Sequence, residues 1–364
     1  MKKRSGPDRG QLYAMKILRK THLYQKRQIE RTKTERKVLS IVKHPFIMKL
    51  HFAFQTDDHL YFVLEYCPGG ELFFHLSRYR RFPERVARFY AAELLLAIGH
   101  LHRRGIIFRD LKPENVLLDA TGHVKLGDFG LSKDGISDPC QGAMSVCGTP
   151  EYMAPEVISR AGHGFCVDYW GLGMLVFEMM TSLPPWYTTD RSELSTRLLS
   201  APLEIPDYMT PSSSHFVSAL LERNPRKRLG VQGYISVTKH RFFKDMDWKQ
   251  LASKRYQPPM NPCEGWRAKL NPGSNAGVTD NEIDGFTSNF DKHFTRMPVN
   301  TEDHQIEQHN SGSEYGSEDN ENPFVGFTFD EIDNHATSSR RGNNAVTNTN
   351  TNSSSPQAMG SRKK

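Results

Sequence analysis

The stretch from Ile106 to Gly130 carries the residues best suited to chemistry. It reads IIFRDLKPENVLLDATGHVKLGDFG, in which Asp110 opens a D-x-K-x-x-N pattern and a D-F-G begins eighteen residues later. Phosphoryl transfer from ATP needs a carboxylate that orients and deprotonates the attacking hydroxyl, and oxygen ligands for Mg²⁺. Asp110 fits the first task, and Asn115 and Asp128 fit the second. Lys112 can neutralise charge on the transferred group. The alternative, a polar loop joining two strands, leaves this spacing to accident.

Hydrophobic periodicity indicates the elements that position these groups. Residues 11–18 alternate like a strand, with Lys16 in the middle, and residues 24–42 have the period of a helix that contains Glu35. A lysine on the apolar face of a strand is costly to bury unless it has a partner. We also expect strands at 47–55 and 60–65, and a long buried helix with Pro83 in its first turn that ends at His102.

Composition restricts the class of protein. A hydrophobic content of 37% over 364 residues is low, and the deficit lies in the polar C-terminal stretch, which we expect to be disordered. No run of eighteen apolar residues predicts a transmembrane helix. The five cysteines are scattered without a C-x-x-C pair, which favours a reducing, cytoplasmic or nuclear setting and argues against a zinc site or a disulfide framework.

Charge is distributed unevenly along the chain. Residues 1–43 hold fourteen lysines and arginines against three acidic residues, whereas residues 284–335 hold twelve acidic residues against two basic ones. The basic segment is typical either of a nucleic-acid face or of a solvated helix. Because the basic residues lack interleaved aromatic residues, we expect no binding of DNA or RNA. We favour a third interpretation, in which the acidic tail folds back over the basic segment.

Four segments make the chain resemble the AGC family of serine/threonine protein kinases, most of all the N-terminal kinase domain of the ribosomal S-six kinases of the RSK type. They read SGPDRGQLYAMKIL, HPFIMKLHFAFQT, LHRRGIIFRDLKPENVLLDATGHVKLGDFGLSK and SVCGTPEYMAPEV. The resemblance implies an α+β fold with a small antiparallel-sheet lobe, one regulatory helix and a large helical lobe. It implies a kinase domain at 1–243, a regulatory tail at 244–331 and a disordered polar tail at 332–364.

The resemblance also implies an ATP site between the two lobes. Lys16 would hold the α- and β-phosphates of ATP and pair with Glu35. Two unrelated surface charges on a basic helix are the alternative. Glu65 and Cys67, where the strand leaves the small lobe for the hinge, and Leu117 would complete the nucleotide site. The implied cofactors are ATP and Mg²⁺, and the implied reaction is phosphorylation of a serine or threonine hydroxyl.

Phosphorylation of the kinase itself is the regulation that the resemblance implies. Ser145 stands at the activation-loop position, eleven residues before Glu156. A phosphate adds roughly −1.5 to −2 charges, which suits pairing with Arg109. In the family, a phosphoinositide-dependent kinase adds this phosphate. Glu156, which closes the A-P-E motif, is expected to form a buried ion pair with Arg228.

The C-terminal tail has two further motifs of the family. FTRMPVNTED resembles the turn motif with Thr301 as its phosphosite, although Glu follows where relatives commonly have Pro. NPFVGFTFD resembles the hydrophobic motif with Thr328 as its phosphosite. Burying two of its rings could contribute on the order of 3–6 kcal/mol before ordering costs. The family implies that they dock beside the helix that carries Glu35.

Substrate choice is implied by two acidic residues. Glu71 and Glu114 match positions that receive arginines upstream of the target hydroxyl in the family. Two carboxylates beside the cleft would select a basic peptide of the form R-x-R-x-x-[S/T] by charge pairing. The expected partners are therefore basic protein substrates and the upstream kinase, bound by a monomer that does not insert into membranes.

The chain departs from the family pattern at two places. Phe108 replaces the His or Tyr that precedes Arg-Asp in relatives and keeps the ring that packs on Phe129. A glycine-rich loop should precede Lys16, but fifteen residues leave too little room, and Gly6 and Gly10 suggest only a turn. We therefore expect the first strand and this loop to be missing, at a cost of about ten- to a hundredfold in ATP affinity. Either the gene model is truncated, or the protein is a pseudokinase or scaffold with weak or no ATP turnover.

Overall fold

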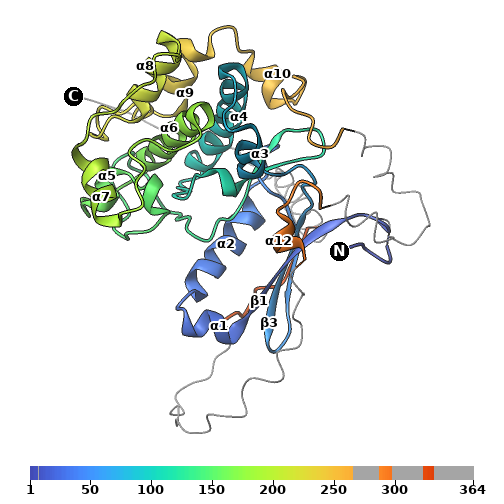
Figure 1. Ribbon diagram of the computed structural model, residues 1–364. Coiled ribbons are helices and arrows are strands. Elements are labelled where there is room, and N and C mark those ends of the chain that lie inside the picture. Colours follow the sequence, from blue (N-terminus) through green and yellow to red (C-terminus); the bar gives the residue numbers. More distant parts are fainter. Residues whose placement is uncertain (7, 265–286, 297–322, 332–364) are drawn as a thin grey trace, which may run out of the picture. The chain divides into compact units, whose positions relative to one another are not determined.

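A computed structural model of the chain describes residues 1–6, 8–264, 287–296 and 323–331. Met1–Phe329 forms one compact unit, and Asp330–Lys364 is a second unit. Figure 1 shows a small sheet with α1 (Lys20–Gln25) and α2 (Ile29–Ile41) beside it and a separate, larger group of helices. Thr301 and the predicted disordered stretch at 332–364 lie outside the described residues.

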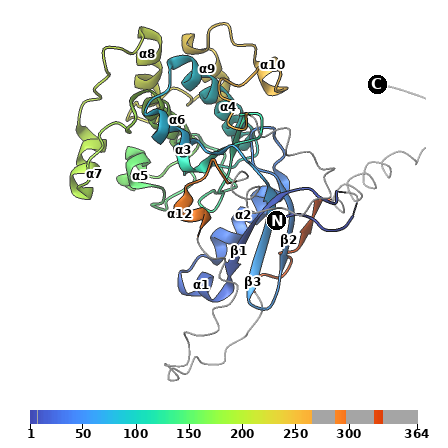
Figure 2. The same cartoon turned by 45° about the vertical axis from the view of Figure 1, so that its right-hand side comes forward.

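The smaller lobe is built on an antiparallel sheet. The central strand β3 (His59–Glu65) pairs with β1 (Tyr13–Arg19) on one side and with β2 (Leu50–Gln55) on the other. Lys16 lies opposite Phe62 in the register of β1 with β3. A short strand from the C-terminal part of the chain, β7 (Phe329–Asp330), follows β2 in the sheet order β1-β3-β2-β7. Figure 2 shows β7 beside β2.

The helical stretch expected at 24–42 is divided in two. It forms α1 (Lys20–Gln25) and α2 (Ile29–Ile41), so the prediction of a single helix was wrong at its N-terminal end. The break lies at Arg27, whose φ of 52° is left-handed and cannot continue a right-handed helix. Within α2, Glu35, Val38 and Leu39 are buried. This helix therefore turns one face inward and leaves its basic residues outside.

A tight turn precedes β1, as predicted from its glycines. Lys2 forms a β-bridge with Leu12, and the chain reverses between them. Gly6 and Gly10 have φ values of 90° and 93°, a region that glycine enters without steric cost. The turn brings residues 2–3 alongside residues 11–12, before the strand that carries Lys16 begins.

The larger lobe surrounds two buried helices. α4 (Glu84–His102) and α6 (Cys166–Thr181) are lined with apolar residues, and α4 begins one residue after Pro83, which caps the helix rather than lying in its first turn. A small sheet, β4 (Gly70–Glu71), β5 (Val116–Leu118) and β6 (Val124–Leu126), carries the loops between Ile106 and Gly130. The other helices among the described residues are α3 (Leu72–Tyr79), α5 (Pro155–Ile158), α7 (Arg191–Ser200), α8 (Pro211–Leu220), α9 (Tyr234–Thr238), α10 (Trp248–Ala252), α12 (Lys292–Thr295) and the 3₁₀ turns η1 (Pro113–Asn115), η2 (Pro150–Tyr152) and η3 (Arg241–Phe243).

In the described part of the chain, no helix is both long enough and apolar enough to cross a membrane.

Candidate active site

Lys16 and Glu35 form the predicted ion pair. The Lys16 Nζ lies 2.8 and 2.9 Å from the two carboxylate oxygens of Glu35, and 3.9 Å from Oδ1 of Asp128. Burial by itself would lower the pKa of Lys16, but attraction from Glu35 and then Asp128 outweighs it and raises the pKa. The ammonium group is therefore kept charged at a partly exposed position, as binding of a phosphate requires.

Asp110 is held in place by three side chains. Its Oδ1 accepts a hydrogen bond of 3.0 Å from the Thr149 hydroxyl, and its Oδ2 accepts one of 2.8 Å from the Asn115 amide. The Lys112 ammonium lies 3.2 Å from Oδ2 and donates to Thr149 over 2.8 Å. The carboxylate, its neutralising lysine and a hydroxyl of the following segment thus form one connected group.

A buried aspartate supports this loop from beneath. The Asp168 carboxylate in α6 accepts hydrogen bonds from the main-chain N–H groups of Phe108 (2.9 Å) and Arg109 (2.8 Å), and from the ring of His102 (2.7 Å). Arg109 itself has a φ of 71°, so the loop makes a sharp left-handed bend at this residue. Phe108 packs edge-on against Phe129 at 5.2 Å, the contact expected for this ring. The loop is thus fixed from two sides.

The residues proposed as Mg²⁺ ligands suit the metal chemically. The Asn115 amide nitrogen donates to Asp110, which leaves its amide oxygen available as a ligand. The Asp128 carboxylate is 56% exposed, and the backbone of Asp128 has a left-handed φ of 56°. Mg²⁺ prefers oxygen ligands, and one or two carboxylates plus substrate phosphates usually suffice for it. Among the described residues, no cluster of three His, Cys, Asp or Glu side chains offers another metal site.

A cleft of about 380 Å³ contains most of the predicted residues. The side chains of Glu65 and Cys67 do not line it, because Glu65 pairs with Lys125 at 2.7 Å and Cys67 is buried. A role for these two hinge residues could involve only their main chain. The cleft is lined by Lys16, Glu35, Leu39, Met48, Leu64, Glu71, Lys112, Glu114, Asn115, Leu117, Gly127 and Asp128.

The segment from Asp128 to Glu156, called the activation segment below, contacts the same loop through Arg109. The guanidinium donates to the Ser145 hydroxyl over 2.8 Å and to the carbonyl of Leu131 over 2.6 Å. Burial lowers the pKa of Arg109, Cys147 and Asp168 act against it, and the positive charge of Arg31 in α2 adds a smaller effect in the same direction as burial. A second positive charge close to Arg109 was not recognised in the sequence.

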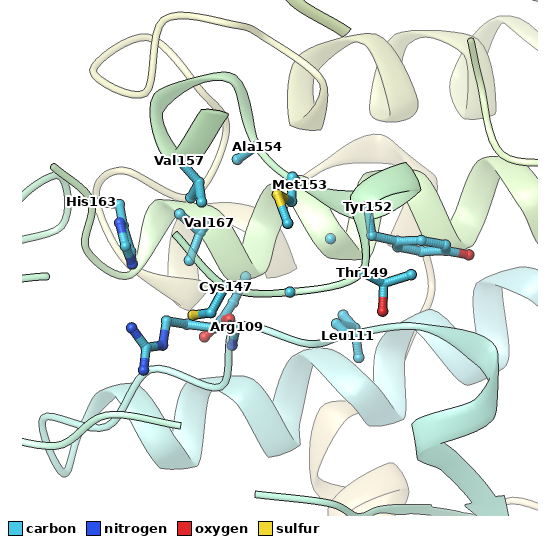
Figure 3. Close-up of a pocket in the computed structure, with 13 residues that line it drawn as sticks. Arg109, Leu111, Cys147, Thr149, Tyr152, Met153, Ala154, Val157, His163 and Val167 are labelled. Carbon is cyan, nitrogen blue, oxygen red and sulfur yellow. Dashed lines mark hydrogen bonds between the residues drawn. The ribbon is translucent and has the colours of Figure 1, made fainter. Parts of the chain in front are cut away.

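A small hollow of about 20 Å³ lies between this loop and the end of the activation segment. Figure 3 shows Arg109, Cys147 and His163 toward one end of the hollow and Leu111 and Thr149 toward the other. At this volume the hollow has room for about one water molecule.

The end of the activation segment is held by the predicted pair of Glu156 and Arg228. The guanidinium donates to both carboxylate oxygens, over 2.6 and 2.9 Å. Arg228 is completely buried and Glu156 is 5% exposed. Arg228 also donates to the carbonyl of Cys166 over 2.9 Å, so the pair joins the segment to the start of α6.

Three phenylalanines of the C-terminal part are buried beside α2. Phe324, Phe327 and Phe329 are each less than 9% exposed, whereas Val325 between them is 83% exposed. Phe327 packs edge-on against Phe62 of β3 at 5.3 Å. Arg36 of α2 donates to the carbonyls of Phe327 (3.0 Å) and Thr328 (2.8 Å). Thr328 itself is exposed. The aromatic motif therefore lies where the resemblance implied.

Two carboxyl groups, those of Glu71 and Glu114, line the cleft, and a third, that of Glu178, is buried near Glu114. Burial raises the pKa of Glu71, and the nearby Glu114 raises it further. Glu178 of α6 was missed in the sequence. Burial, followed by repulsion from Glu114 and Glu151, raises the pKa of Glu178 to about 8, and its Oε2 is buried without a hydrogen-bond partner. A lone carboxylate within the apolar run of α6 was the available signal.

Comparison with known proteins extends this picture. The protein kinase domain family matches residues 3–243, and the protein kinase C-terminal domain family matches residues 281–329. Ribosomal protein S6 kinase alpha-6 of Mus musculus is 48% identical over 73% of this chain and 34% of its own length. Ribosomal protein S6 kinase alpha-3 of Homo sapiens is also 48% identical, over 73% of this chain and 36% of its own.

A relative from Dictyostelium discoideum, the RAC family serine/threonine-protein kinase homolog, is 45% identical over 70% of this chain and 57% of its own length. The chain thus spans between about a third and somewhat more than half of these relatives. The chain belongs to the protein kinase family, as a serine/threonine kinase of the AGC type in which a protein kinase C-terminal domain follows the protein kinase domain.

Proposed function

We propose that this chain transfers the γ-phosphoryl group of ATP to serine or threonine hydroxyls of basic proteins. The observation that carries the proposal is the fixed position of Asp110 within hydrogen-bonding distance of Asn115 and Thr149 and beside Lys112, next to the cleft that Lys16 and Glu35 line. Such a constellation supplies both positioning and electrostatic stabilisation, which dominate phosphoryl transfer.

Each side chain has a defined task in this proposal. Asp110 orients the attacking hydroxyl and accepts its proton, and Lys112 neutralises charge on the transferred phosphoryl group. Lys16, held by Glu35, binds the α- and β-phosphates. Bound Mg²⁺ would neutralise the phosphates and orient them for in-line displacement. Asn115 and Asp128 would hold that metal through their side-chain oxygens.

The substrates we propose are basic peptides with an R-x-R-x-x-[S/T] pattern. Glu71 and Glu114 line the cleft, and Oε2 of the buried Glu178, near Glu114, has no hydrogen-bond partner in the described structure. An arginine of the substrate would supply that partner and would favour ionisation of the carboxyl. A positional peptide library should show a preference for arginine upstream of the target residue. Equal phosphorylation of neutral peptides would exclude this substrate class.

We also propose that phosphates on Ser145, Thr301 and Thr328 activate the kinase. A phosphate on Ser145 would lie within reach of Arg109, whose guanidinium already contacts the Ser145 hydroxyl, and would form charge-assisted hydrogen bonds with it. A phosphoinositide-dependent kinase is the proposed donor for Ser145. We place this regulation in the cytoplasm or nucleus, in a monomer that binds neither nucleic acid nor membrane.

A phosphotransfer assay tests the proposed reaction. The full chain, with radiolabelled ATP, Mg²⁺ and a basic peptide, should label the peptide, and the Asp110→Ala variant should not. Equal labelling by both proteins would contradict the assignment of Asp110 as the base.

A further inference from the structure

Two thiols face each other between the activation segment and the start of α6. The Sγ atoms of Cys140 and Cys166 are 3.9 Å apart. Both side chains are buried, Cys140 being 6% exposed and Cys166 fully covered. Neither residue belongs to the phosphoryl-transfer site, and the proposed function assigns no role to either.

The main chain holds the two thiols opposite one another. The N–H of Cys166 donates to the carbonyl of Pro139 over 2.8 Å, and Ala143 and His163 exchange two main-chain hydrogen bonds of 2.9 and 2.8 Å. The two backbones are so close at Gly164 that a Cβ atom there would lie 2.2 Å from the carbonyl oxygen of Asp138. Residues 138–143 are therefore seated on residues 163–166, with the thiols at the centre of the contact.

This geometry is close to that of a cross-link. A disulfide has a sulfur–sulfur distance of about 2.0 Å, so the two sulfur atoms must approach by roughly 2 Å. The proposal requires that rotation of the two side chains about their Cα–Cβ bonds, with a shift of the activation segment, brings the sulfur atoms into bonding distance.

We propose that Cys140 and Cys166 form a reversible disulfide when the protein meets hydrogen peroxide. Cys140, the less deeply buried thiol, is oxidised first to a sulfenic acid, and one water molecule is released. The sulfur of Cys166 then attacks the sulfur of Cys140. The S–S bond forms as the S–O bond breaks, and the departing hydroxide takes the proton of the Cys166 thiol as the second water. Two thiols thus lose two electrons to one peroxide.

The burial of Cys166 orders these two steps. Burial raises the pKa of the Cys166 thiol, with the neighbouring Cys140 as the next cause. Since the thiolate is the reactive form, Cys166 alone reacts slowly with an oxidant in solution. Oxidation at Cys140 places a sulfenic acid directly beside it, so condensation within the pair becomes the available reaction.

The cross-link would close a loop around the regulatory part of the activation segment. Residues 141–165 lie between the two cysteines and include Ser145, Thr149 and Glu156. A disulfide would fix the start of this loop on α6 and hold the segment in the conformation in which Arg109 contacts Ser145. Reductants with free thiols would reverse it. The disulfide would therefore make the mobility of the activation segment depend on the local redox state.

Peptide mapping of the oxidised full chain tests the proposal. The protein is treated with hydrogen peroxide, remaining thiols are alkylated, and the digest is analysed by mass spectrometry without reduction. We expect a linked peptide pair that contains Cys140 and Cys166, released by dithiothreitol. Cys140→Ser and Cys166→Ser should abolish the linked pair. Cys147→Ser is the matched control, because Cys147 lies on the same segment and is more exposed, and it should leave the pair intact.

A second readout measures the seating of the segment itself. Oxidation should slow tryptic cleavage between residues 141 and 165 by about tenfold, because cleavage requires transient opening. It should raise the unfolding midpoint by on the order of 5 °C. Both effects should be absent in Cys140→Ser, whose folding is checked by its own unfolding midpoint. Oxidation of Cys147 without a link between Cys140 and Cys166, or unchanged cleavage of linked protein, would overturn the proposal. Neither readout depends on kinase activity.

Discussion

Glu178 is the residue whose environment departs most from its sequence context. Its carboxyl group lies in α6, is 7% exposed, and has the pKa raised to about 8 by burial and by Glu114 and Glu151. The group is therefore protonated at neutral pH and ionises as the pH rises through 8. Because a basic peptide binds the ionised form more tightly, the charge of this residue controls substrate affinity in our proposal.

Raising the pH from 7 to 9 should lower the KM for an arginine-containing peptide by about three- to tenfold, with a smaller change in kcat. Steady-state kinetics across this range measure the effect. Glu178→Gln should flatten the dependence, whereas Glu193→Gln, at an exposed position on α7, should keep it. Identical KM profiles for wild type and Glu178→Gln would show that this carboxyl does not contact the substrate.

The same group makes a contribution to stability with a defined sign. Between pH 4.5, the ordinary value, and about 8, the folded protein holds a proton on Glu178 that the unfolded chain has lost. The contribution of this group to the free energy of unfolding therefore decreases as the pH rises through that window. Chemical denaturation at pH 5.5 and 8.5 should show a smaller decrease for Glu178→Gln than for wild type. An equal decrease in both would place the pKa near its ordinary value.

A buried ion pair gives a second prediction for single residues. Arg228 is fully buried and bonds both oxygens of Glu156, so removing one partner leaves an uncompensated charge. Arg228→Met should lower the free energy of unfolding by about 3–5 kcal/mol. The double variant with Glu156→Gln should recover part of this loss, and denaturant unfolding measures all three proteins. Equal stability of wild type and Arg228→Met would contradict the structural role of the pair.

At the scale of elements, α2 is the helix on which several parts of the molecule converge. Glu35 pairs with Lys16 in the cleft, Arg36 binds the carbonyls of Phe327 and Thr328, and Lys37 pairs with Asp134 of the activation segment. Three successive residues thus bind three different segments. Because the helix is short and its isolated stability is small, these contacts decide its position.

Releasing the aromatic motif should therefore disturb the active site. Phe327→Ala removes a ring that packs on Phe62, and we expect kcat/KM to fall by about tenfold as α2 loosens. Hydrogen exchange should rise in α2 and in residues 323–329. Val325→Ala, at the exposed position of the same segment, is the matched control and should change neither. A loss of activity without added exchange in α2 would separate the motif from this helix.

Spacing in the sequence was sufficient to predict some contacts but not others. The pair of Lys16 with Glu35 was predicted because a lysine on the apolar face of a strand needs a partner and the resemblance supplied one. The pair of Glu156 with Arg228 was predicted from the resemblance alone. The break at Arg27 could not be predicted, because a left-handed residue leaves no periodic signal. Glu178 was missed although it is an acidic residue within the apolar run of α6, because its approach to Glu114 and Glu151 exists only after folding. Glu65 and Cys67 were expected in the nucleotide site, but their side chains do not line the cleft, which the sequence could not indicate.

At the scale of the whole molecule, residues distant in sequence meet at the cleft and at α2. The strands at 11–18 and 60–65 and the long helix that ends at His102 followed from hydrophobic periodicity, and the division into two lobes followed from the resemblance to a known family. The contact between residues 323–329 and α2 depended on the aromatic motif, which would be costly to leave in water. The Arg36 side chain binds main-chain carbonyls of that motif, and nothing in the sequence around Arg36 indicated this contact.

The central claim is that this chain performs phosphoryl transfer with Asp110 as its base. The most direct measurement compares ATP binding and the rate of peptide phosphorylation in the full chain and in Asp110→Asn, which keeps the size of the side chain. We predict ATP affinity within about threefold in the two proteins and a kcat lower by roughly 10²–10⁴ in the variant. ATP binding with no phosphorylation by the wild-type chain, or equal kcat values in both proteins, would contradict the claim.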